Sequence, residues 1–107
     1  MNNTKEVMDS IAKRLQEDPA KTEGIEKVIA INLTGDEAGR WVIDCTQKPA
    51  QVKQDNSAQA SMTITMAAHD FVSMANGELN PQMAFLSGKV KVDGDLGLAI
   101  KLGKILA

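Results

Sequence analysis

Few residues in this sequence could carry out catalysis, and they are widely separated. His69 is the only histidine, so an acid–base or nucleophile–histidine mechanism would have to use it. The local pattern predicts that His69 lies on the polar side of a helix with Ser73 and Asn76, with no nucleophile placed beside it. A solvated helical residue is therefore favoured over a catalytic one.

The single cysteine, Cys45, does not indicate a redox or metal function. It is predicted to face inward on a strand without a basic neighbour in sequence, so a small buried side chain is favoured over a reactive thiol. One cysteine forms no internal disulfide, and no second Cys or His cluster is present for zinc, which agrees with a reducing compartment. We expect neither a metal site nor a cofactor.

Phosphate and nucleic-acid ligands are not favoured either. Residues 94–97 (Gly-Asp-Leu-Gly) begin a helix after a strand, with Asp95 as the expected cap, but they lack the first glycine of a dinucleotide fingerprint. Residues 1–87 carry 8 Lys/Arg against 12 Asp/Glu, while residues 88–107 carry 4 against 2. With only Trp41, Phe71 and Phe85 as aromatic side chains, this mild asymmetry is far from a nucleic-acid surface.

The stretch at residues 96–107 is predicted to be a helix that is apolar around most of its circumference. Its apolar side chains sweep roughly 220°, whereas a helix on a single core needs a stripe only a little wider than ~100°. Only Gly97, Lys101 and Lys104 lie opposite. A second surface must contact this helix, and the candidates are another subunit, a membrane or an apolar ligand.

The lysines Lys101 and Lys104 lie one turn apart on the polar stripe of that helix. A solvated face is the simpler interpretation. The alternative is transient docking on an anionic membrane surface.

Methionine is the compositional excess that bears on this choice. Met62, Met66, Met74 and Met83 fall within one third of the chain, and thioether side chains adapt their shape to varied apolar partners. The methionines and the wide apolar arc favour a ligand cavity and simple core packing about equally.

The elements that must position these residues can be located by periodicity. A helix follows the cap Asn3 and stops before Asp18-Pro19; strands are expected at 28–34 and 40–46, with a weak edge strand at 50–53. Val42 is expected to point outward from its strand.

The second half of the chain alternates strands and helices. Residues 62–66 form a strand and 67–76 a helix whose polar side includes Asp70, while Asn80 caps a helix that ends at Gly88. The next strand spans 89–92, and about twenty intervening residues allow a crossover that leaves it parallel to the strand at 62–66.

These elements predict an α+β fold with helices layered on a five-stranded mixed sheet. At 107 residues we expect a single domain spanning residues 1–107. No window approaches eighteen consecutive apolar residues and the first residues lack a signal-peptide core, so a soluble, unexported protein is expected.

Residues 61–102 resemble the sterol carrier protein 2 domain, most specifically in the run from Gly77 to Leu102. The run contains Asn-Pro-Gln-Met-Ala-Phe-Leu-Ser-Gly-Lys and, later, Gly-Asp-Leu-Gly-Leu-Ala-Ile-Lys-Leu. The strand Trp-Val-Ile-Asp at 41–44 is similar to the family's tryptophan strand, and the element order fits the whole chain.

The resemblance implies a five-stranded sheet and helices enclosing an apolar tunnel closed by the C-terminal helix. It implies binding and transfer of fatty acids, fatty acyl-CoA or sterols, with no catalysis by the domain. The tunnel positions that carry over are the inward ones: Trp41, Ile43, Met62, Ile64, Met66, Phe71, Met74, Met83, Phe85, Leu86, Leu98, Ile100 and Leu102.

Peroxisomal members of that family end in Ser/Ala-Lys-Leu, whereas this sequence ends Ile-Leu-Ala, so we expect a cytoplasmic location. Two alternatives to a lipid carrier stay open. One is a protein-interaction module whose apolar C-terminal helix docks on a partner, and the other is a lipid-processing enzyme that uses His69.

Overall fold

The computed structural model describes residues 3–22 and 24–106, and the side chains of Lys21 and of residues 102–106 lie outside that description. The chain runs through α1 (Thr4–Glu17), a 3-10 turn η1 (Pro19–Thr22), β1 (Val28–Thr34), β2 (Gly39–Asp44), β3 (Gln51–Gln54), β4 (Met62–Ala67), α2 (Ala68–Ala75), α3 (Pro81–Leu86), β5 (Val90–Asp93) and α4 (Leu96–Leu106).

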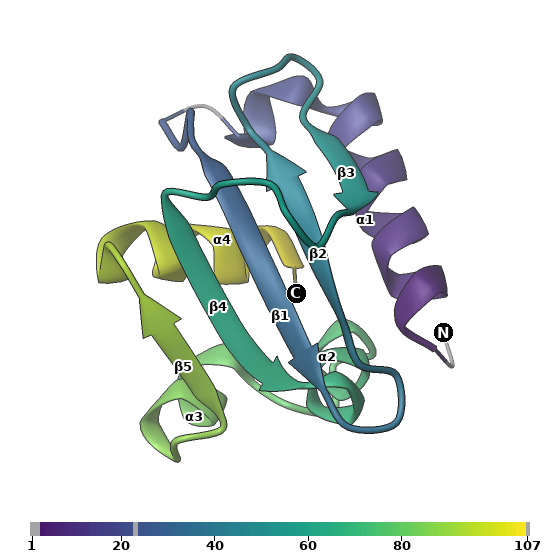
Figure 1. Cartoon of the computed structure of the whole chain (residues 1–107), viewed down its shortest axis with the longest axis vertical. Coiled ribbons are helices and arrows are strands. Elements are labelled where there is room, and N and C mark those ends of the chain that lie inside the picture. Colours follow the sequence, from purple (N-terminus) through teal and green to yellow (C-terminus); the bar gives the residue numbers. More distant parts are fainter. Residues whose placement is uncertain (1–2, 23, 107) are drawn as a thin grey trace.

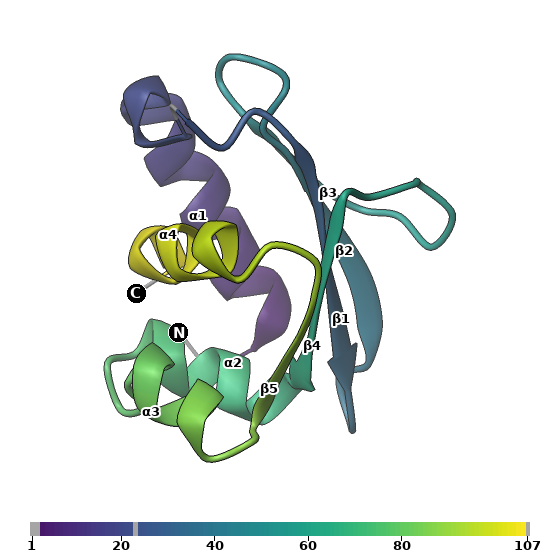
Figure 2. The same cartoon turned by 90° about the vertical axis from the view of Figure 1, so that its left-hand side faces the viewer.

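The strands form one mixed sheet in the order β3-β2-β1-β4-β5 (Figure 1). Strands β1 and β4 are parallel, and the other neighbouring pairs are antiparallel. Helices α1, α2, α3 and α4 all lie on one side of this sheet (Figure 2). The predicted α+β architecture with five strands is therefore confirmed.

The predicted direction of the last strand was wrong. Strand β5 is antiparallel to β4, with Thr63 opposite Asp93 and Met66 opposite Val90. Helices α2 and α3 both lie at the end of the sheet where β4 finishes, so the chain enters β5 from that end and runs back (Figure 1). A connection long enough to cross over is necessary for a parallel pair, but it does not enforce one.

Alternate strand residues point toward the helices and form the core. Ile31 of β1 pairs with Trp41 of β2 and with Ile64 of β4, which pairs with Val92 of β5. Directly opposed residues share a face, so these four side chains make one row beneath the helices. Helix α1 adds its apolar stripe to the same core: Val7, Met8, Ile11 and Leu15 are all buried.

None of the described helices covers the opposite face of the sheet, yet Val42 is buried there, contrary to the expectation that it points into solvent. The segment 55–61 crosses this face between β3 and β4 (Figure 1). Hydrogen bonds from the Arg40 side chain to the Asp55 carbonyl (3.1 Å) and from Ser61 N to the Val28 carbonyl (2.8 Å) fasten it.

The helix caps were predicted from sequence and are confirmed. Asn3 Oδ1 accepts a hydrogen bond from Glu6 N at 2.9 Å, and Asn80 Oδ1 accepts one from Gln82 N at 2.9 Å. Asp95 Oδ1 accepts from Gly97 N at 2.8 Å at the start of α4. A second face assignment, besides that of Val42, was wrong, because Asp70 of α2 is buried instead of solvated.

Candidate functional site

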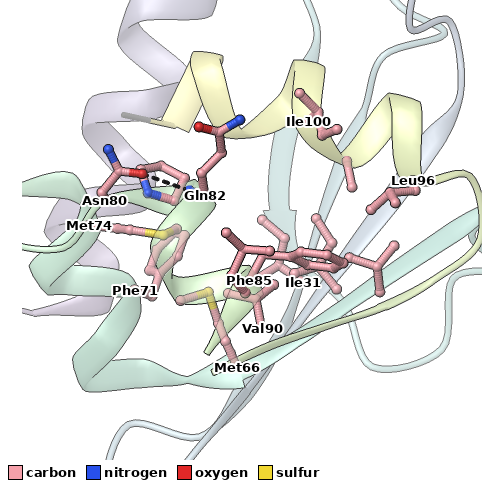
Figure 3. A pocket seen from close by; sticks show the side chains of 15 residues that line it. Ile31, Met66, Phe71, Met74, Asn80, Gln82, Phe85, Val90, Leu96 and Ile100 are labelled. Atoms are coloured by element: carbon pink, nitrogen blue, oxygen red, sulfur yellow. Dashed lines mark hydrogen bonds between the residues drawn. The ribbon is translucent and has the colours of Figure 1, made fainter. Parts of the chain in front are cut away.

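An apolar cavity of about 580 Å³ lies between the helix side of the sheet and the helices α2, α3 and α4 (Figure 3). Its size falls within the range of small-molecule pockets. The lining residues are Ile31, Ile64, Met66, Phe71, Met74, Asn80, Pro81, Gln82, Phe85, Leu86, Val90, Val92, Leu96, Ala99 and Ile100.

Three strands make the floor of this cavity and three helices make its walls. The floor consists of alternate, helix-facing residues of β1, β4 and β5. Phe71 and Met74 of α2 are buried at its inner end, whereas Leu86 of α3 and Ile100 of α4 are 76% and 48% exposed. The cavity is therefore closed toward the core and reaches solvent between α3 and α4.

The described lining contains little polarity. Its polar side chains are the amides of Asn80 and Gln82, and none of the lining residues is Asp, Glu, Lys, Arg or His. Asn80 Oδ1 already accepts hydrogen bonds from Gln82 N at 2.9 Å and Met83 N at 3.3 Å. Such a surface suits an apolar molecule with few hydrogen-bonding groups.

Part of the residue set predicted from sequence comes together here. The predicted positions that line the cavity are Ile64, Met66, Phe71, Met74, Phe85, Leu86 and Ile100.

Five other predicted positions lie elsewhere. Ile43 and Met62 are buried in the core, and Trp41 and Leu98 are partly buried against it. Met83 does not line the cavity and is 61% exposed. The Leu102 side chain lies outside the described part of the structure.

Sequence reasoning did not place Ile31, Asn80, Pro81, Gln82, Val90, Val92, Leu96 and Ala99 in the site. Two signals pointed to some of them. Ile31, Val90 and Val92 are inward residues of alternating strands, and Leu96 lies on the apolar arc of the last helix. The cap residues gave no such signal, because a capping role already accounts for Asn80.

The residues with reactive side chains lie outside the cavity lining. The His69 side chain is 84% exposed, and its Nε2 lies 3.1 Å from Asp70 Oδ1. Cys45 is buried, and desolvation, assisted by the charge of Asp44, raises the pKa of its thiol to about 11. Within the described residues no three His, Cys, Asp or Glu side chains are grouped as a metal site requires.

Of the two lysines predicted to dock on membranes, the structure describes the side chain of Lys101 only. Lys101 is exposed, and its Nζ lies 3.5 Å from the point that a Cβ on Gly24 would occupy, so it reaches toward the turn before β1. Lys101 does not line the cavity. The Lys104 side chain lies outside the described set. As far as the chain is described, none of its helices has the length and apolar character needed to cross a bilayer.

Comparison with known proteins places this chain among lipid-transfer domains. Residues 8–107 match the model of the SCP-2 sterol transfer family. The sequence is 39% identical over 103 residues to hydroxysteroid dehydrogenase-like protein 2 of Xenopus laevis, covering 94% of this chain and 24% of that protein. The human protein of that name is 39% identical over 82 residues, or 76% of this chain and 20% of the relative. The chain thus spans a quarter or less of these relatives.

Solved structures agree over nearly the whole chain. Sterol carrier protein 2 of Aedes aegypti, solved in complex with palmitate, is 28% identical with a TM-score of 0.76, covering 95% of this chain and 92% of that one. The apo form from Yarrowia lipolytica is 26% identical with a TM-score of 0.75, covering 94% and 86%. The family match and this shared fold lead to one conclusion: the chain is a member of the SCP-2 sterol transfer family.

Proposed function

We propose that this protein binds one long-chain lipid in the cavity and carries it between membranes without chemically changing it. The observation that carries the proposal is the apolar cavity of about 580 Å³, closed toward the core and open between α3 and α4. The candidate ligands are fatty acids, fatty acyl-CoA and sterols. The palmitate complex of the Aedes aegypti relative supports a binding role for the shared fold.

The energetics of such binding are sufficient. Burying a long acyl chain at about 0.8 kcal/mol per methylene contributes roughly 12 kcal/mol before other costs. Association and ordering oppose this by at least about 4 kcal/mol. The difference is at most about 8 kcal/mol, which corresponds to a dissociation constant of about 1 μM or weaker and suits a reversible carrier.

Helix α4 acts as a movable wall in this proposal. Its residues Leu96 and Ile100 line the cavity, yet they are 46% and 48% exposed. A bound lipid would cover part of this surface and supply the second apolar contact that the helix lacks. Lys101 and Lys104 would assist docking on anionic membranes while the lipid enters or leaves.

The test is uptake of pyrene-labelled lipids, one with an alcohol head and one with a carboxylate head, by the protein and by Ala99→Phe. Ala99 is partly buried and lines the cavity, so a phenyl ring there should occupy ligand volume and weaken uptake at least tenfold. Ala38→Phe, at an exposed site in the β1–β2 connection, is the control. Unchanged uptake by Ala99→Phe would move the binding site away from this cavity.

The runner-up is a protein-interaction module whose apolar C-terminal helix, α4, docks on a partner together with the neighbouring helix α3. Met83 and Leu86 of α3 are 61% and 76% exposed, as apolar anchors for a partner would be. Native mass spectrometry separates the two functions. A preparation without bound lipid that also takes up neither labelled lipid at tens of micromolar would exclude the carrier and favour the partner module.

A further inference from the structure

The polar groups around the cavity bear on which lipid head it accepts. Among the described residues that line the cavity, only Asn80 and Gln82, at the start of α3, carry side-chain amides. Lys89 and Lys91, the lysines nearest to Gln82 in sequence, do not line the cavity. Lys101 of α4 does not line it either and reaches toward Gly24. No described lining residue is therefore cationic.

Of the two amides, Gln82 is the one whose carbonyl oxygen takes no part in capping α3. The Asn80 carbonyl oxygen is occupied by two backbone N–H groups of α3, at 2.9 Å and 3.3 Å. The Gln82 side chain extends from α3 toward α4 (Figure 3), and both Gln82 and Ile100 line the cavity. Gln82 is itself exposed, so its amide lies at the mouth while the floor beneath is apolar.

A side-chain amide both donates and accepts hydrogen bonds but carries no charge. It can pair with a hydroxyl or a carbonyl oxygen of a neutral lipid. A carboxylate needs a cation or full hydration to offset its desolvation, whereas the described lining of this mouth supplies neutral amide groups beside apolar side chains.

We propose that the cavity selects lipids with an uncharged, hydrogen-bonding head, such as long-chain alcohols and sterols, and that Gln82 is the specificity-determining residue. This inference rests on the proposed lipid-binding function. A fatty acid then binds mainly in its protonated form, since protonation turns the head into a neutral partner for the amide.

The experiment compares 1-hexadecanol with palmitate, which share a sixteen-carbon chain and differ at the head, by displacement of the pyrene-labelled alcohol. At pH 8 we expect hexadecanol to bind at least tenfold more tightly. At pH 5, close to where carboxylic acids titrate, palmitate should come within about threefold of hexadecanol. The hexadecanol affinity at both pH values is the internal control for acid effects on the protein.

Variants at Gln82 test the residue itself. Loss of one hydrogen bond in Gln82→Leu should weaken hexadecanol binding about fivefold, and Gln82→Lys should make palmitate the preferred ligand at pH 8. Gln16→Leu makes the same chemical change at an exposed position of α1, away from the cavity lining, and should change neither affinity.

The outcomes separate this inference from the function on which it rests. Palmitate binding as tight as hexadecanol binding at pH 8, or equal affinities in Gln82→Leu and the parent protein, would overturn the head-group selection and leave lipid binding standing. Failure of both ligands to bind would overturn the lipid carrier, and the selection with it.

Discussion

Phe71 belongs both to the hydrophobic core and to the cavity wall. It is 1% exposed, yet it lines the cavity at its inner end. We predict that Phe71→Ala lowers the free energy of unfolding by about 3–5 kcal/mol, because it removes a fully buried ring. Urea unfolding followed by circular dichroism measures this loss.

Phe85 offers a matched control, because it also lines the cavity but is 38% exposed. Phe85→Ala should cost only roughly 1–2 kcal/mol, since less of its surface is withdrawn from water. Equal losses in the two variants would mean that Phe71 contributes no more to the core than a residue at the cavity mouth.

Cys45 makes folding stability sensitive to high pH. Burial raises the pKa of its thiol from the ordinary 9.0 to about 11 in the folded chain. The unfolded chain therefore releases this proton first, so the stabilisation is complete below pH 9 and is lost as pH rises toward 11.

The measurement is urea unfolding of the parent protein and of Cys45→Ala between pH 8 and pH 10.5. We expect the stability of the parent to fall more steeply with pH than that of the variant. In the folded parent, the thiol should also react slowly with maleimide at pH 8 until urea unfolds the chain. Parallel pH profiles for the two proteins would contradict the raised pKa.

At the scale of elements, the turn between β5 and α4 sets how close the last helix lies to the sheet. Gly94 in this turn has φ +133°, and a Cβ there would lie 3.0 Å from Met62 Cγ and 3.2 Å from Met62 Cα. Because one of these neighbours is backbone of β4, it cannot move aside cheaply.

We predict that Gly94→Ala destabilises the protein and weakens lipid uptake, because α4 carries Leu96 and Ile100 of the cavity wall. Gly88→Ala is the control: Gly88 has φ +81° but nothing within 4 Å of a new Cβ, so it tests backbone strain without the contact. The control should lose about 1 kcal/mol and retain uptake. Similar uptake by both variants would show that the turn does not position the wall.

In the whole molecule, the exposed large apolar side chains and the cavity mouth belong to the same two helices, α3 and α4. If Lys101 assists docking there, Lys101→Glu should slow lipid transfer to anionic vesicles at low salt. Added salt should slow the parent toward the same rate, because the attraction is screened beyond about 10 Å at 0.1 M salt. A fluorescence assay with donor and acceptor vesicles measures both rates.

Lys48→Glu, at an exposed site between β2 and β3, makes the same charge change in another part of the surface and should leave transfer unaltered. Rates that match in all three proteins at every ionic strength would return Lys101 to the role of a solvated side chain.

The sequence by itself determined the elements and the fold class. Strand β1 has the predicted limits, 28–34, and the caps Asn3, Asn80 and Asp95 stand where they were expected. These signals are readable because periodicity and capping depend on residues that are neighbours along the chain.

Only the tertiary structure decided which inward residues share the cavity. Trp41, Ile31, Ile64 and Val92 form one row on the same face, but Trp41 lies on β2, beyond the strands β1, β4 and β5 that make the floor. Alternation assigns a side chain to a face and says nothing of the helix above it.

The direction of β5 and the place of Gln82 were decided in the same way. Both follow from where α2 and α3 lie against the sheet and how far α4 stands from α3, which long-range packing sets. Periodicity and caps report contacts within a few residues of the chain, whereas a cavity is the volume that distant elements leave unfilled between them.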